Sequence, residues 1–166
     1  MMAEALAVVG VVASIVQLVD FGSKVLLRLN DFQSTAREIP KTFQHVKAEL
    51  PVLLDTLKQT KSAIENGSIS DDTKAALLPA IDGCRTQVEL LNAVIEKVLP
   101  LPSDSWRERS RKAIASLRQD GRVQKIRKDL QGYIQALTYY HAASSSTIRP
   151  LMGIGFPNLD ILVTSS

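Results

Sequence analysis

The sequence has few of the residues that crosslink a fold or hold a metal. A single cysteine, Cys84, stands among its 166 residues, so no disulfide can form within the chain. Cys84 lies among apolar neighbours in a helical pattern, the ordinary place for a buried structural thiol. The two histidines, His45 and His141, are far apart and have no cysteine or acid beside them at metal-ligand spacing. We therefore expect no metal site.

Motifs for catalysis and cofactor binding are also missing. Gly153 and Gly155 are not followed by a third glycine and a helix, so the sequence predicts no phosphate-binding loop. Asp71 and Asp72 are explained by the start of a helix, where acidic side chains face the positive end of the helix dipole. We expect that the chain is not an enzyme and binds no cofactor.

Aromatic residues are scarce as well, at 5% of the chain, whereas apolar residues make up 45%. This balance favours helices that pack through aliphatic side chains. Long stretches keep helical spacing, and none alternates with the period of a strand. We predict an all-α fold, an antiparallel bundle of four to five helices in one domain at residues 1–148, with a tail at 149–166.

The expected helices are recognised by rows of apolar residues spaced alternately by three and four. The first covers about residues 3–31. The second helix is expected to end at Asn66-Gly67, and its inward row is Ile39, Phe43, Val46, Leu50, Leu53 and Leu57. The third is expected to begin at Ser70, and its inward row is Leu77, Ile81, Cys84, Val88, Leu91, Ile95 and Val98. A shorter helix is expected to end at Asp120-Gly121, before a last helix. The inward residues of the shorter helix are Trp106, Ala113, Ile114 and Leu117. Those of the last helix are Val123, Ile126, Leu130, Tyr133, Leu137 and Tyr140.

The tail reads RPLMGIGFPNLDILVTSS from residue 149 and cannot extend the preceding helix. Two explanations stay open. It is an ordered strap or a linker to a further module, or it is a short β-prone segment around Leu159–Val163 that pairs with copies of itself. Pro157 and Asp160 argue against a strong amyloid former.

The most informative stretch is an apolar run at Ala5–Val19 with only two polar interruptions. A helix that is apolar all round must be enclosed by other helices or enter a membrane. This run makes about 22 Å of helix, short of the ~30 Å hydrocarbon core of a bilayer. Continuing it to Leu29 reaches far enough but puts Asp20, Lys24 and Arg28 in or near lipid.

No basic residue precedes the apolar run, which starts after MMAEA, so it does not resemble a secretory signal. We expect a protein made in the cytosol. A monomer that exposed the whole run would be poorly soluble, so we expect these side chains to be buried at rest against the other helices: Leu6, Val9, Val12, Ile15 and Val16. The residues predicted to enter a membrane on activation are Leu6, Val8, Val9, Val12, Ile15 and Val16.

Positive charge is concentrated between Arg107 and Lys128, where nine Lys or Arg stand against two acids. Such a cluster is a solvated helix face, a site for anionic lipid headgroups, or a nucleic-acid site. Nucleic-acid binders usually interleave stacking aromatics with the bases, and here only Trp106 is near, so nucleic acid is not an expected partner. The candidate headgroup- or anion-binding residues are Arg107, Arg109, Arg111, Lys112, Arg122, Lys125 and Arg127.

The order of four sequence stretches resembles a known family. The opening MAEALAVVGVVASIVQLVDFGSKVLLRLNDF is similar to the N-terminal domains of fungal NOD-like receptors and other STAND proteins, the Ses-type and HeLo-like group. The resemblance continues in IPKTFQHVKAELPVLLDTL, in TQVELLNAVIEKVLP and in WRERSRKAIASLRQDGRVQKIRKDLQGYIQAL. It covers residues 2–148.

This resemblance implies a helical bundle that executes or regulates programmed cell death in fungal innate immunity, including heterokaryon incompatibility. Related HeLo domains, and the four-helix domain of the mixed lineage kinase domain-like protein, act at membranes. The leading hypothesis is an effector that oligomerises and permeabilises a membrane through its first helix, moving from the cytoplasm to the plasma membrane on activation. The alternative is a soluble interaction module that transmits receptor assembly without binding lipid.

The partners implied are anionic membrane lipid, further copies of the chain, and a NACHT or NB-ARC receptor in cis or in trans. Two possibilities stay open for the chain itself. It is either the N-terminal part of such a receptor or a stand-alone effector whose tail carries the activation motif.

Overall fold

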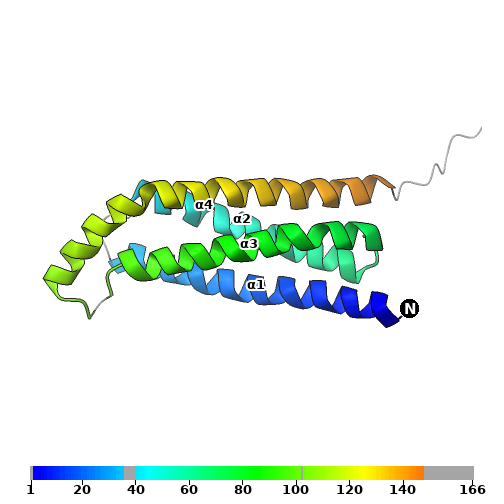
Figure 1. Ribbon diagram of the computed structural model, residues 1–166, viewed down its shortest axis with the longest axis horizontal. Coiled ribbons are helices and arrows are strands. Elements are labelled where there is room, and N and C mark those ends of the chain that lie inside the picture. The colour runs from blue at the N-terminus through cyan, green and yellow to red at the C-terminus, as the bar shows by residue number, and fades with distance from the viewer. Residues whose placement is uncertain (1, 36–39, 102, 148–166) are drawn as a thin grey trace, which may run out of the picture.

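A computed structural model describes residues 2–35, 40–101 and 103–147 of the chain. These residues form four helices, which confirms the predicted all-α fold (Figure 1). The predicted tail at 149–166 lies outside the described residues. The helices are α1 (Met2–Thr35), α2 (Lys41–Glu65), α3 (Asp71–Val98) and α4 (Trp106–Thr147).

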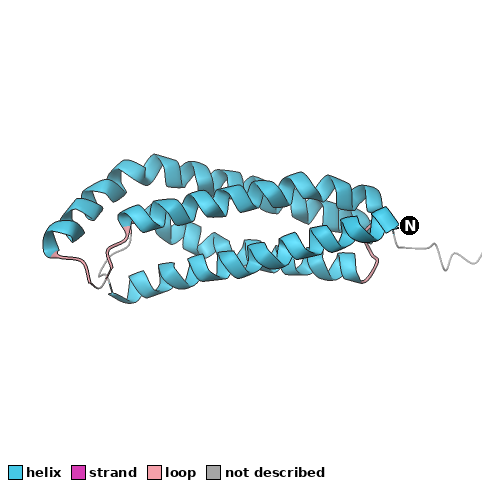
Figure 2. Ribbon diagram, turned by 60° about the horizontal axis from the view of Figure 1, so that its bottom comes forward, coloured by secondary structure: helices cyan, strands magenta, loops and turns pink. Residues whose placement is uncertain are grey.

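The four helices form an elongated bundle in which consecutive helices run in opposite directions, as predicted (Figures 1 and 2). α1 packs against α2 and α3, and α4 packs against the same two helices. α1 and α4 therefore occupy opposite corners of the bundle. Each of these two helices has one side on the core and the other side facing outward.

The ends of α2 and α3 follow from local sequence. α2 ends at Glu65 with Asn66 as its C-cap, and Gly67 then takes the left-handed backbone conformation (φ 70°) that glycine adopts without steric cost. The side chain of Ser70 accepts a hydrogen bond from the backbone N–H of Thr73, which caps the start of α3 as predicted. Asp71 lies in the first turn, where its charge favours the positive end of the helix dipole.

The two rows predicted for α2 and α3 are buried at every described position. They form the core together with residues of α1 and α4, and their members are Phe43, Val46, Leu50, Leu53 and Leu57; Leu77, Ile81, Cys84, Val88, Leu91, Ile95 and Val98. Ile39 lies outside the described residues. Cys84 is buried, as predicted, and this burial raises the pKa of its thiol to about 12.

The break predicted at Asp120-Gly121 is wrong, because α4 continues through both residues. A glycine inside a helix costs only about 1 kcal/mol relative to alanine, and the buried residues Ser116 and Val123 hold the helix against the bundle on either side. Asp120 does not cap a new helix. Its Oδ1 accepts a hydrogen bond of 2.6 Å from the Thr42 hydroxyl of α2.

The first turns of α4 are angled away from the rest of the helix and extend past the ends of the other three helices (Figure 1). This placement corrects two predictions of burial. Trp106 is 74% exposed and Ile114 is 58% exposed, because this part of α4 has few neighbours to cover them. The side chains of Ala113 and Leu117 lie outside the described residues. Further along α4, Val123, Ile126, Leu130 and Leu137 are buried as predicted.

Candidate functional site: two exposed helix faces

The inner side of α1 belongs to the core of the bundle. It consists of Val11, Ile15, Leu18, Val25 and Leu29, which are all buried. Gly22 lies on the same side, where an added Cβ atom would come within 2.8 Å of a methyl carbon of Leu54. α1 and α2 therefore approach closely along this row.

The outer side of α1 carries apolar residues that water reaches. Val9 is 66% exposed and Val16 is 47% exposed, so the prediction that both are buried is wrong. Ile15 is buried as predicted, and Val12 is half-buried. The side chains of Leu6 and Val8 lie outside the described residues.

The geometry of a corner helix explains this correction. Residues seven apart, such as Val9 and Val16, lie on one face of a helix, while Val11, Ile15 and Leu18 lie on the opposite face. With only α2 and α3 as main neighbours, α1 can bury one face. A helix that is apolar all round must then leave apolar side chains exposed on the other.

One stretch of α1, Val9–Asp31, is long and apolar enough to cross a membrane by length and composition alone, and it is the only such stretch in the described part of the chain. Buried core helices of soluble proteins and N-terminal signal sequences share these properties. In this protein, only 28% of the apolar part of the stretch is buried in the bundle. Asp20 and Lys24 on this stretch neutralise each other in an ion pair of 2.8 Å.

Three of the seven candidate headgroup-binding residues form ion pairs within the described part of the chain, and that of Arg111 with Glu108 is an exposed one of 3.8 Å. Lys112 Nζ lies 2.6 Å from Asp104 Oδ2, and these side chains are only 12% and 9% exposed. The hydrogen bond from Lys112 holds the pKa of the Asp104 carboxyl below its usual value. Arg127 Nε donates to Glu49 of α2 at 2.7 Å. Lys112 and Arg127 therefore stabilise the start and the middle of α4.

Five of the exposed cations of α4 lie in one row because the helix is continuous. The row is spaced by three or four residues and includes Ile114 near its middle. We call it the basic face: Arg107, Arg111, Ile114, Arg118, Arg122 and Lys125, all exposed. Arg118 was not among the predicted binding residues, and the continuous helix aligns it with Arg122 and Lys125 after Gly121. Arg109 lies off this row, near enough to Asp104 to lower the pKa of its carboxyl.

The basic face and the start of α1 lie at opposite ends of the bundle (Figures 1 and 2). The angled start of α4 is at one end, and the N-terminus of α1 is at the other. α1 contains 34 residues, which makes it about 51 Å long. In the folded bundle, the basic face and the exposed valines at the start of α1 are therefore far from each other.

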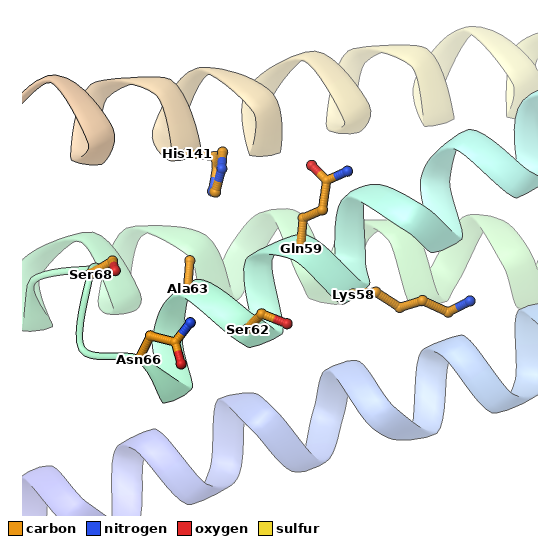
Figure 3. Close-up of a pocket in the computed structure, with 7 residues that line it drawn as sticks. All are labelled: Lys58, Gln59, Ser62, Ala63, Asn66, Ser68 and His141. Carbon is orange, nitrogen blue, oxygen red and sulfur yellow. The ribbon is translucent and has the colours of Figure 1, made fainter.

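A shallow cleft of about 620 Å³ lies between the end of α2 and the last turns of α4 (Figure 3). His141 points toward it from α4, and the other lining residues come from α2 and the loop after it: Lys58, Gln59, Ser62, Ala63, Asn66 and Ser68. These seven residues include no carboxylate or thiol that could pair with the histidine in acid–base or nucleophilic catalysis. Among the described residues, no group of His, Cys, Asp and Glu is placed to hold a metal ion.

Comparison with known proteins identifies the bundle. No curated protein and no solved structure matches the chain. One family profile does match, over residues 12–137, a range that begins in α1 and ends in the last quarter of α4. The resemblance to N-terminal domains of STAND receptors is confirmed by this match: the chain belongs to the SesA family, described as the N-terminal domain on NACHT NTPase and P-loop NTPases.

Proposed function

We propose that this SesA domain is a cell-death effector or signalling domain of fungal innate immunity and heterokaryon incompatibility, which acts by self-association and by inserting α1 into a membrane. The observation that carries the proposal is the outer face of α1, where Val9 and Val16 are exposed on a stretch without Asp, Glu, Lys or Arg before Asp20. This helix is long enough to span a bilayer.

Insertion has a clear energetic balance. To leave the bundle, α1 gives up the burial of its inner row, which stabilises the fold by about 1.5–3 kcal/mol for each large aliphatic side chain. A bilayer restores that burial and also covers residues that are exposed in the bundle, namely Val9, Val16 and Leu27. The membrane state therefore gains apolar contact that the resting bundle lacks.

The charges on α1 oppose complete insertion. Asp20 and Lys24 form an ion pair, and Arg28 is bonded to Asn92 and Glu96 of α3 at 2.9 Å and 3.1 Å. Arg28 must break these contacts to leave the bundle with the rest of α1. This requirement favours a resting state that is held until receptor assembly or self-association supplies the trigger, with the protein moving from the cytoplasm to the plasma membrane.

The second candidate function is a soluble interaction module. The same exposed valines would then contact another protein, and the domain would transmit assembly of a NACHT or NB-ARC receptor without touching lipid. The family description, which places such domains on NACHT NTPases, supports this reading. Vesicle leakage separates the two candidates, because only the first requires lipid.

The decisive experiment measures dye release from anionic vesicles with the full chain and two matched variants. Val16→Glu places a charge on the outer face of α1, where a charge near the centre of a span costs about 2.5–3.5 kcal/mol for insertion. Val52→Glu makes the same change at an exposed position of α2, which is 52% exposed against 47% for Val16.

We expect Val16→Glu to lose leakage and Val52→Glu to keep it, with both variants folded by circular dichroism. A folded Val16→Glu protein that leaks as well as the wild type contradicts insertion of α1. If the wild type causes no leakage at all, the soluble interaction module is the better reading.

A further inference from the structure

The outward face of α3 is acidic. The core row of α3 points inward, and on the opposite side the exposed residues at seven-residue spacing are Asp82, Glu89 and Glu96. Leu78 lies on the same side, one turn before Asp82, as an exposed apolar side chain. We call this set the acidic face: Leu78, Asp82, Glu89 and Glu96.

Most of the acidic face is available to a partner. In the described part of the chain, no ion pair joins Asp82 or Glu89 to a cation of the same molecule. Glu96 is bound by Arg28. The nearest cation along the helix, Arg85, instead donates to the Ser14 carbonyl of α1 at 3.4 Å. Asp82 and Glu89 are therefore left without an ion pair in the described part of the chain.

The acidic face of α3 matches the basic face of α4 in charge, length and composition. The basic face extends over about 27 Å from Arg107 to Lys125, and the acidic face also extends over about 27 Å, from Leu78 to Glu96. Each row also has one exposed aliphatic residue, Ile114 on α4 and Leu78 on α3. The two faces lie on neighbouring helices and belong to different outward sides of one bundle.

We infer that the basic face of α4 docks on the acidic face of α3 of a second copy of this chain. Because the two contacting surfaces differ, the contact is heterologous, and every bound copy still offers one free face of each kind. Association of this type grows into a ring or an open filament. The inference deepens the self-association within the proposed function and requires no lipid.

Two observations favour a second copy over an anionic bilayer as the partner of the basic face. The basic face lies at the opposite end of the bundle from the start of α1, so a membrane held there is far from the valines proposed to insert (Figure 1). The adjacent α3 also presents Asp82 and Glu89, which an anionic surface repels. A second copy, in contrast, offers each of the two faces a surface of opposite charge.

Charge reversal on each face tests the contact without lipid. Arg111→Glu, Arg118→Glu and Arg122→Glu together make the basic face net acidic, and Asp82→Lys with Glu89→Lys makes the acidic face net basic. Sedimentation velocity of the full chain at low salt should show self-association of the wild type and at least a tenfold weaker association of either variant. Lys41→Glu, Lys58→Glu and Lys61→Glu on α2 together change the net charge as much as the first variant and should leave association unchanged.

Mixing the two face variants provides the sharpest result. Each variant alone has two faces of the same sign, but an unlike pair has complementary faces, so the mixture should form complexes that neither variant forms alone. Recovery of binding also shows that both variants are folded. Exposed charges are screened beyond about 8 Å at physiological ionic strength, so wild-type association should weaken as salt rises.

The proposal is overturned if the wild type stays monomeric at low salt, or if the mixture stays monomeric while both variants keep the wild-type circular dichroism. It is also overturned if reversal of the basic face abolishes binding to anionic vesicles but leaves self-association intact, since lipid is then the partner of that face. These outcomes are independent of the leakage result for Val16→Glu, so the contact and the insertion of α1 can fail separately.

Discussion

Tyr133 of α4 lies directly against Gly83 of α3, and a Cβ atom added at Gly83 would come within 2.2 Å of Cζ of the tyrosine ring. Glycine is therefore required at this point for α3 and α4 to approach as closely as they do. The contact sits beside buried Cys84, in the part of the core where the two helices meet.

We predict that Gly83→Ala destabilises the bundle. The ring must move or the helices must separate, which typically costs about 1–3 kcal/mol, whereas the helix propensity of alanine returns about 1 kcal/mol. Gly132→Ala is the matched control, because a Cβ atom there meets no atom within 4 Å. Urea unfolding should show a loss for Gly83→Ala and no loss for Gly132→Ala. Tyr133→Leu should reduce the penalty of Gly83→Ala, and additive effects of the two changes would argue against the contact.

The two sides of α1 should respond differently to truncation. Ile15→Ala removes a fully buried side chain and should lower the free energy of unfolding by about 2–5 kcal/mol. Val16→Ala changes an exposed neighbour and should stay within about 0.5 kcal/mol of the wild type. Chemical denaturation of both variants checks this. Equal losses would mean that α1 packs with another face inward.

The Cys84 thiol should resist modification in the folded protein. Its pKa of about 12 keeps it protonated at pH 8, and burial blocks access, so a thiol reagent should react slowly in buffer and rapidly in denaturant. The raised pKa also means that the folded state holds the proton more tightly than the unfolded state. The contribution of the Cys84 thiol to the free energy of unfolding is therefore fully present below pH 9 and is lost as the pH rises from 9 toward 12. Rapid labelling at pH 8 without denaturant would contradict the buried placement.

Asp104 should stabilise the start of α4 in a pH-dependent way. Its Oδ2 accepts hydrogen bonds of 2.6 Å from Lys112 Nζ and from the Leu101 backbone N–H, and these lower the pKa of the carboxyl. A lowered pKa in the folded state gives stability that is present above the unfolded value of 3.8 and lost as the pH falls below it. Asp104→Asn should therefore be less stable than the wild type at pH 7, and thermal unfolding should show the difference shrinking below pH 4. A difference that is constant with pH would rule out the ionised pair as its cause.

Local sequence determined much of this fold. The rows of α2 and α3 alternate apolar and polar residues at helical spacing, so their buried sides could be predicted, and the same pattern placed Cys84 in the core. Ser70 and Gly67 marked helix ends because capping and left-handed backbone depend on a few neighbouring residues. The family resemblance was predictable for the same reason, since it rests on the order of these patterns along the chain.

The tertiary structure decided what local pattern could not. α1 is apolar on every side, so only the positions of α2 and α3 determine that Ile15 is buried and Val16 is exposed. α4 passes through Gly121 because contacts on both sides hold it against the bundle. Arg127 was predicted to bind a headgroup, but it is paired with Glu49, 78 residues earlier in the chain. The spacing of residues along one helix does not reveal such a contact. In each case the outcome depends on which helices become neighbours, and that is a property of packing rather than of any single stretch of sequence.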